Sequence, residues 1–199
     1  DASRMHILQG LTKMRQICNT PALLADNEYY GSQSAKLDEL ITQVLKLQSE
    51  HKVLIFSQFV GMLDLIKVRL DQETIKYAYL TGQTRKRQEQ VEAFQEDEEI
   101  RVFLISLKAG GTGLNLTEAE YVFIVDPWWN PAVENQAIDR AYRIGQTNKV
   151  IAIRMITPNT IEEKIMELQD RKKKLVEELI HTDSGFFKQL TKNDLMGMV

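Results

Sequence analysis

The sequence contains a single cysteine, Cys18, among its 199 residues. Disulfides within the chain are therefore excluded, and a reducing compartment is favoured. The three histidines lie far apart, at positions 6, 51 and 181, with no cysteine or acid at ligand spacing, so we expect no metal site. No apolar run approaches the roughly 20 residues that a membrane-spanning helix needs, and no signal peptide opens the chain, so we expect no membrane partner. The first residue is Asp1 instead of Met, which favours a fragment of a longer protein.

A strong charge of one sign is also lacking. The formal net charge is −3, which gives no global argument for nucleic-acid binding, so such an argument must come from local clusters. The run 171–174 is the sharpest basic cluster; runs like it are usually a solvated helix face, and this one could also contact phosphates. With 43% apolar and 27% charged residues, the chain can bury a substantial core as one domain with appendages.

The usual parts for holding a nucleotide are missing too. A P-loop requires Gly-Lys-Ser/Thr, and no Gly-Lys pair occurs in the chain. A dinucleotide fingerprint that begins at Gly111 would need a glycine at 116, where Leu116 stands. The acidic residues 97–99 precede a predicted strand, whereas a magnesium-binding acidic box would follow one. If this chain contributes to a nucleotide site, it contributes only a part of it.

Five short β-rich runs alternate with helical patterns. Several of these runs are almost continuously apolar, as in parallel strands covered on both faces. The runs occupy 52–56, 77–80, 101–106, 121–126 and 150–156. Helical spacing marks 35–48 and 61–70, a further helix follows Thr84 as its predicted N-cap, and another begins at Asn130-Pro131. This alternation predicts an α/β fold of three layers with a mostly parallel sheet.

Two segments lie outside that alternation. Residues 3–18 have the pattern of a helix, and a loop follows to about residue 33. At the other end, Thr160 and Glu163 predict a capping box that starts a long helix. Its apolar stripe, which Lys172 interrupts, consists of Ile161, Ile165, Leu168, Leu175 and Leu179. We therefore divide the chain into a lead-in at 1–33, a main lobe at 34–158, a long helix at 159–181 and a tail at 182–199.

Polar residues gather where the predicted strands end. Ser57 and Gln58 follow the first strand, Thr81 the second, Ser106 the third, and Asp126 ends the fourth. In an open parallel sheet, ligands bind beyond the carboxyl ends of the strands, so these side chains are candidates for a binding edge. For Asp126 we favour a role as a cap of the next helical region over a catalytic one.

The loop at 106–117, SLKAGGTGLNLT, adds backbone donors to that edge. Gly110, Gly111 and Gly113 allow amides to approach a ligand closely, and Thr112 and Asn115 supply side-chain hydrogen bonds. Such a loop suits phosphate, of a nucleotide or of a nucleic-acid backbone, although glycines at this spacing also occur in purely structural turns.

The segment QAIDRAYRIGQ at 136–146 concentrates the phosphate-binding chemistry. Spacings of four and three residues place Gln136, Arg140 and Arg143 on one face of a predicted helix. Two arginines beside a polar amide make a poor core and a good clamp for the charge on a transferring phosphoryl group. The plain alternative is a solvated face in which Asp139 pairs with Arg143.

Several motifs together resemble the Swi/Snf-type ATPases, the DNA translocases of superfamily two that include chromatin remodellers. The motifs are KVLIFSQF at 52–59, SLKAGGTGLNLTEA at 106–119, VDPWWNP at 125–131, QAIDRAYRIGQ at 136–146, RQICNTPALL at 15–24 and AKLDELI at 35–41. They occur in the family's order over nearly the whole chain. The resemblance implies the second, C-terminal RecA-like helicase lobe, with a lead-in helix and a long brace helix at 161–180.

In that family ATP lies between two lobes, and the first lobe carries the P-loop and the acidic box. The resemblance therefore implies that ATP and Mg²⁺ are held mainly by a first lobe, and that Arg140 and Arg143 are arginine fingers positioned with help from Gln136. Gly111, Gly113 and Asn115 complete the implied nucleotide contacts. The implied contacts to double-stranded DNA are Ser57, Gln58, Thr81, Ser106, Lys108 and Thr112.

Two departures from the family pattern are Tyr142, where histidine is frequent, and Asn19-Thr20, where Asn-His is common. Neither removes an implied phosphate ligand. The compact form favours a prokaryotic member, which would be cytoplasmic and nucleoid-associated; a eukaryotic member would be nuclear. Two other functions stay open: an interaction module that has lost the ATPase role, and the C-terminal lobe of an RNA helicase. The isolated chain is expected to lack ATPase activity.

Overall fold

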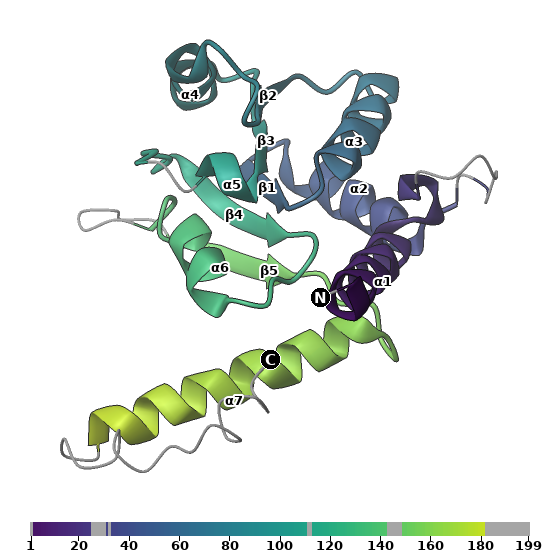
Figure 1. Cartoon of the computed structure of the whole chain (residues 1–199). Coiled ribbons are helices and arrows are strands. Elements are labelled where there is room, and N and C mark those ends of the chain that lie inside the picture. Colours follow the sequence, from purple (N-terminus) through teal and green to yellow (C-terminus); the bar gives the residue numbers. More distant parts are fainter. Residues whose placement is uncertain (1, 25–30, 32, 111–112, 143–148, 182–199) are drawn as a thin grey trace.

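A five-stranded parallel sheet forms the centre of the structure (Figure 1). The computed structural model describes residues 2–24, 31, 33–110, 113–142 and 149–181. The strand order is β2-β3-β1-β4-β5, and every neighbouring pair is parallel. The strands are β1 (Lys52–Ser57), β2 (Tyr77–Leu80), β3 (Val102–Ser106), β4 (Ala119–Ile124) and β5 (Ile151–Arg154). All five predicted strands and the α/β class are confirmed.

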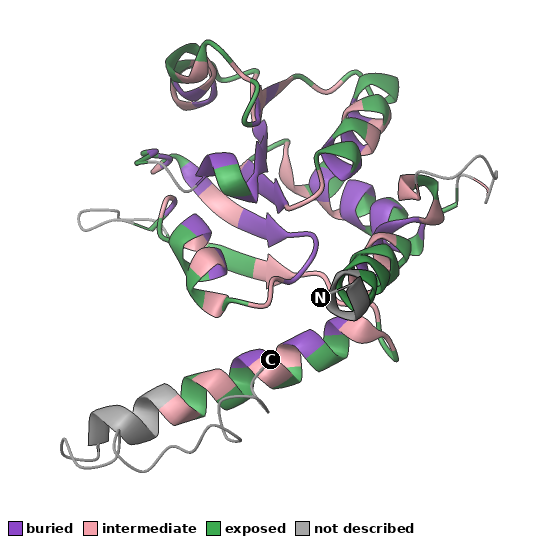
Figure 2. Cartoon of the chain, viewed as in Figure 1, coloured by how far each residue is buried: buried purple, intermediate pink, exposed green. Residues whose placement is uncertain are grey.

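Helices cover both faces of this sheet, as the apolar runs require. On one face lie α2 (Ala35–Leu47) and α3 (Val60–Gln72), and on the other lie α4 (Arg87–Glu96), α5 (Leu107–Gly110) and α6 (Pro131–Ile138) (Figure 1). Side chains alternate along each strand, so Val53 and Ile55 of β1 pack with α2 and α3, whereas Leu54 and Phe56 pack toward the opposite layer. Most residues of β1, β3 and β4 are therefore buried on both sides, whereas β5 at the edge of the sheet is more exposed (Figure 2).

Three further elements flank the three layers. They are α1 (Ala2–Asn19), the short 3₁₀ helix η1 (Pro21–Leu23) and α7 (Ile161–His181). The C-terminal half of α1 approaches the sheet, while much of its remaining described surface is exposed (Figure 2). α7 extends along the molecule from a start beside α1 (Figure 1). In the described part of the chain, no helix is both long and apolar enough to cross a membrane.

The predicted caps have different outcomes. Asn130 is confirmed as the N-cap of α6, because its side-chain oxygen accepts from the amide of Ala132 at 3.1 Å. The prediction for Thr84 is wrong: α4 begins only at Arg87, and the Thr84 hydroxyl accepts from the amide of Thr81 at 2.9 Å. Thr84 thus closes the turn after β2 instead of starting a helix.

Of the capping box predicted for α7, the contacts of the described residues include only the bond to the N-cap hydroxyl. The Thr160 hydroxyl accepts from the Glu162 amide at 3.2 Å, as an N-cap would. The carboxylate that reaches back is that of Glu162, which accepts from the Thr157 amide at 2.8 Å, whereas Glu163 is exposed. The inward face of α7 therefore carries the buried acid Glu162 beside Ile165. The apolar stripe of this helix does not predict a buried acid.

Candidate functional site

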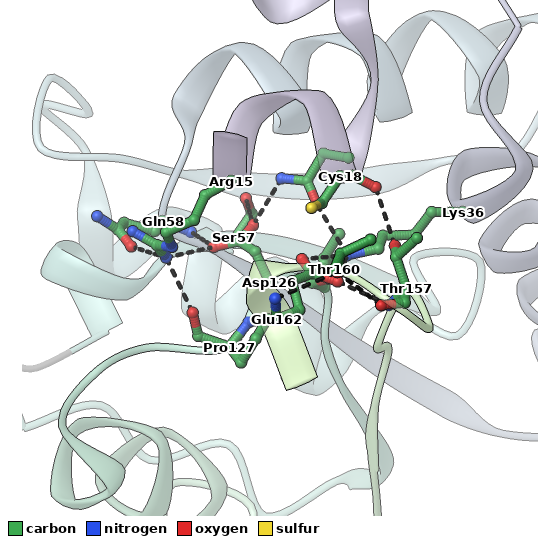
Figure 3. A network of polar contacts seen from close by, with 12 residues as sticks. Arg15, Cys18, Lys36, Ser57, Gln58, Asp126, Pro127, Thr157, Thr160 and Glu162 are labelled. Atoms are coloured by element: carbon green, nitrogen blue, oxygen red, sulfur yellow. Dashed lines mark hydrogen bonds and ion pairs between the residues drawn. The ribbon is translucent and has the colours of Figure 1, made fainter. Parts of the chain in front are cut away.

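Asp126 lies at the carboxyl edge of the sheet, where β1 and β4 end, and its side chain is fully buried (Figure 3). The Ser57 hydroxyl donates to its carboxylate at 2.5 Å, the Gln58 amide at 2.9 Å and the Asn19 side-chain amide at 3.2 Å. Burial raises the pKa of Asp126, and the bonds from Ser57 and Gln58 oppose that shift. The expectation that Asp126 caps the next helix was wrong, because Asn130 does so; Asp126 instead joins α1 to β1.

Arg15 of α1 faces the same carboxylate and is only 2% exposed. Its Nη2 atom donates to the Pro127 carbonyl at 2.9 Å and to the Gln58 side chain, and lies 3.9 Å from the Asp126 carboxylate. The guanidinium carbon lies 4.9 Å from the centre of the Trp128 ring. Burial lowers the pKa of Arg15, and the charge of Asp126 opposes that shift. The sequence interpretation did not single out Arg15. A signal was present, because Arg15 and Asn19 are four residues apart at the end of α1 and so share one face of that helix.

A second buried cluster ties the start of α7 to the sheet (Figure 3). The Lys36 ammonium donates to the Glu162 carboxylate at 2.5 and 2.7 Å, to the Asn19 side chain at 3.1 Å and to the Val125 carbonyl at 3.0 Å. The two charged side chains are 5% and 0% exposed. Lys36 lies in the first turn of α2, Asn19 ends α1 and Val125 follows β4, so this one ammonium group holds four segments together.

The helix that leads to the predicted fingers is shorter than expected. α6 ends at Ile138, and the backbone then tightens: the Arg140 amide donates to Ala137 at 3.3 Å and the Ala141 amide to Ile138 at 3.0 Å. These i→i−3 bonds form a 3₁₀-type turn, so the prediction of one continuous helix through Arg140 was wrong. Arg143 lies outside the described residues.

Arg140 lies in the turn after α6, next to the segment that leads into the start of β4. Its carbonyl accepts from the Leu116 amide at 3.0 Å, which joins the turn after α6 to the segment after the glycine loop. Its side chain is half-buried, and within the described residues its Nε atom is buried without a hydrogen-bond partner. A guanidinium with a buried, unpaired donor is ready to accept an anionic partner. Gln136, the third member of the predicted constellation, is exposed on α6.

The glycine loop comes close to the sheet at one position and turns at another. A Cβ atom on Gly110 would lie 2.9 Å from Cε1 of Phe56, so only glycine fits there. Gly113 has a φ of +52° and is exposed, as is Asn115. Gly111 and Thr112, two of the predicted ligand residues, lie outside the described residues.

Three of the predicted DNA contacts have side chains that point inward. Ser57, Thr81 and Ser106 are 0%, 5% and 4% exposed. The Thr81 hydroxyl accepts from the Gln83 amide at 3.3 Å, and the Ser106 hydroxyl from the Ala109 amide at 3.4 Å. Each of the three hydroxyls accepts from a backbone amide of the turn that follows its strand, so these side chains shape the edge of the sheet.

Exposed cations instead mark the rim of that edge. Lys108 of α5 is exposed as predicted, and Gln58 is half-buried with its side chain bound to Arg15. Sequence reasoning missed Arg85 and Lys86, which are exposed just before α4. The neighbouring Arg87 donates to the Ala109 carbonyl at 2.7 Å, so the start of α4 lies against α5. No cluster of three or more His, Cys, Asp or Glu side chains in the described ranges could hold a metal ion.

Residues 34–145 match the family model of the helicase conserved C-terminal domain. The chain is 40% identical over 185 residues to a putative ATP-dependent helicase/translocase, YwqA of Bacillus subtilis, covering 89% of this chain and 20% of that protein. It is 42% identical over 167 residues to the ATP-dependent helicase rhp16 of Schizosaccharomyces pombe, covering 81% of this chain and 19% of that protein. The chain thus spans about a fifth of the length of these relatives.

A solved structure has the same fold. The crystal structure of the C-terminal part of the Fun30 ATPase domain superposes with a TM-score of 0.66 at 37% identity, covering 79% of this chain and 53% of that one. The family match contains the glycine loop, Asp126 and Arg140. The chain therefore belongs to the helicase conserved C-terminal domain family, as the C-terminal lobe of a superfamily-two ATP-dependent helicase or translocase of the Snf2/Rad5 type.

Proposed function

We propose that this chain is the second motor lobe of an ATP-dependent double-stranded DNA translocase. In this proposal the lobe supplies Arg140 and Arg143 as arginine fingers and part of the DNA track, and a first lobe holds most of the ATP and the Mg²⁺. The Nε atom of Arg140, buried and unpaired among the described residues, is the observation that carries the proposal. We also propose the division into a lead-in at 1–33, a RecA-like lobe at 34–158, a brace helix at 159–181 and a tail.

The position of Arg140 supports a role in phosphoryl transfer. The bond between its carbonyl and the Leu116 amide fixes its backbone, so only the side chain moves toward a ligand. A guanidinium held in this way can donate to oxygens of the transferring phosphoryl group, where negative charge is concentrated. The chain lacks a Gly-Lys pair, and therefore a P-loop of its own, so the nucleotide would be held from the opposite side.

The DNA track in this proposal is the exposed rim at the carboxyl edge of the sheet. Lys108, Arg85 and Lys86 come from α5 and from the segment before α4, which the bond from Arg87 to Ala109 keeps adjacent. Basic side chains on the surface bind phosphates without reading sequence, as a translocase requires. The buried hydroxyls of Ser57, Thr81 and Ser106 would act indirectly, by holding the turns that present this rim.

The experiment uses the two-lobed protein with Arg140→Ala, Arg140→Lys and Arg143→Ala. DNA-stimulated ATP turnover should fall about 10³-fold or more in the alanine variants, since removing an arginine finger costs about 10³–10⁵ in related enzymes. Lysine should restore little of it, because it lacks the planar fork. Binding of duplex DNA should be unchanged.

The matched control is Arg69→Ala, which removes a surface arginine paired with Asp38 and should leave turnover intact. The isolated chain should hydrolyse ATP negligibly. Normal DNA-stimulated turnover in Arg140→Ala, or vigorous turnover by the isolated chain, would refute the proposed role.

A further inference from the structure

The middle of α7 carries a buried amide that the proposed chemistry does not use. The Gln169 side chain is 5% exposed, on a helix whose neighbouring positions 170 and 171 are exposed. Its Nε2 atom donates to the Trp128 carbonyl at 2.6 Å and to the Glu134 carboxylate at 2.8 Å. Both N–H groups of this amide therefore have acceptors. Neither acceptor belongs to α7: one lies in the segment after β4, and the other on α6.

Glu134 is a fully buried acid on α6. Besides Gln169, it accepts from the Trp128 amide at 2.7 Å and from Nε of Arg154 in β5 at 2.6 Å. Its carboxylate thus has donors from three elements or segments. A buried carboxylate held in this way fixes the rotation of α6 about its axis, because turning the helix would separate the charge from its donors.

The orientation of α6 in turn sets where Arg140 leaves the helix. Ala137 and Ala141 are 3% and 0% exposed and pack in the same core as the glycine-loop residue Leu116. The amide of Arg140 bonds back to Ala137, and its carbonyl is tied to Leu116. Only about one and a half turns of chain separate Glu134 from Arg140, so a shift at Glu134 reaches the arginine with little attenuation.

We infer that Gln169 is a positioning residue for Arg140: by binding Glu134 and Trp128, it couples the position of α7 to the placement of the arginine. The inference rests on the proposed function of Arg140 as a finger. In this inference α7 does more than pack against the lobe. A movement of α7 would act through the two hydrogen bonds of Gln169 and shift α6, and with it the position of Arg140. Lys172, one turn further along α7, donates to the Trp129 carbonyl at 3.4 Å and adds a second side-chain contact between α7 and the segment after β4.

The test compares Gln169→Met with Asp170→Met in the two-lobed protein. Methionine keeps the length of the side chain and removes both donors. Steady-state kinetics of DNA-stimulated ATP hydrolysis should show kcat about tenfold lower for Gln169→Met, since small misplacements of catalytic groups cost up to about 10²-fold. The KM for ATP should stay within about twofold, because Arg140, which these hydrogen bonds position, acts mainly in the transition state. Asp170→Met, at the adjacent exposed position, should behave as the wild type.

A second variant separates positioning from stability. Gln169→Glu turns both donors into acceptors facing a carbonyl and a carboxylate, so kcat should be low at about pH 8. As the pH falls toward about 6, protonation of the new carboxyl restores one donor, and kcat relative to the wild type should rise. A purely structural residue would lower the melting temperature without changing this pH profile. Should Gln169→Met fail to fold, the pH profile of Gln169→Glu decides the question.

Arg140→Ala is the reference that separates the two proposals. If it retains turnover, the finger role fails whatever Gln169 does. If it loses turnover while kcat and its pH profile stay at wild-type values in the Gln169 variants, the finger role stands and positioning by Gln169 is overturned.

Discussion

Breaking the buried ion pair between Lys36 and Glu162 should destabilise the lobe far more than breaking an exposed pair on the same helix. The two side chains are 5% and 0% exposed, and the ammonium lies 2.5 Å from the carboxylate. Lys36→Met would leave the Glu162 charge buried, with the Thr157 amide as its remaining donor among the described residues. Removing one partner of a buried pair costs about 3–5 kcal/mol, and we expect a value in that range. With a urea m-value of about 3 kcal/mol/M, the midpoint would fall by about 1–1.7 M.

The double variant tests the physical reason. In Lys36→Met/Glu162→Met the pair leaves no uncompensated charge behind. The remaining cost comes from the Thr157 amide, the Val125 carbonyl and the Asn19 side chain, which lose these partners, at about 1–3 kcal/mol for a buried group left unsatisfied. The double variant should therefore be more stable than the sum of the single variants predicts, with a coupling energy of about 2 kcal/mol or more. Urea unfolding followed by tryptophan fluorescence measures all three variants, since Trp128 and Trp129 lie near this cluster and are half-buried.

The matched control is Arg69→Met, which breaks the exposed pair with Asp38. Asp38 lies on α2 with Lys36, so both pairs involve the same helix, but the Arg69 and Asp38 side chains are 33% and 57% exposed. This variant should cost at most about 1 kcal/mol. Equal costs for Lys36→Met and Arg69→Met, or strict additivity in the double variant, would refute the reasoning that desolvation makes the buried pair decisive.

Two further predictions concern DNA binding and alkaline stability. In the two-lobed protein, Arg85→Ala/Lys108→Ala should reduce the slope of log K against log salt for duplex DNA by about 0.9 for each phosphate that the variant no longer neutralises. The control Lys76→Ala, at the opposite edge of the sheet and paired with Glu99, should leave that slope unchanged. An unchanged slope in the double variant would show that this rim is not part of the DNA track. Burial raises the pKa of Tyr77 to about 12 from its ordinary 10.0, so the folded state keeps a proton that the unfolded state releases, and stability should fall as the pH rises from about 10 to 12. Tyr77→Phe should make the fall in unfolding free energy over that range shallower, as measured by urea titrations at each pH, and an unaltered slope would contradict the assignment.

The fold was readable from the sequence because it depends on periodicity. Continuous apolar runs such as residues 101–106 are compatible only with strands covered on both faces, and the helical stripes supply the covering layers. Local chemistry also sufficed for Asn130, whose cap involves residues only two positions apart. These features arise from neighbours in the chain, so no tertiary information is required to predict them.

The errors share a different cause, which is competition between nearby groups. The Thr84 hydroxyl accepts from the Thr81 amide and does not cap α4. Glu162, and not Glu163, points inward, where it pairs with Lys36 and accepts from the Thr157 amide. The helix through Arg140 ends early, where the turn is tied to Leu116. In each case a specific contact, local for Thr84 and with a distant segment for Glu162 and Arg140, outweighs a modest local propensity.

Sequence alone was sufficient for the α/β class and for the resemblance to the family, because these follow from strand and helix periods and from motifs within single segments. The choice of Arg140 stays a prediction. Sequence alone was not sufficient for the buried charges that hold the edge in place: Arg15, Lys36, Glu134 and Glu162 all read as surface residues of their helices. Their partners come from far along the chain, as with the 126 residues between Lys36 and Glu162. A charge is buried only where folding supplies its counter-charge and hydrogen bonds, and that supply exists only once the helices are packed.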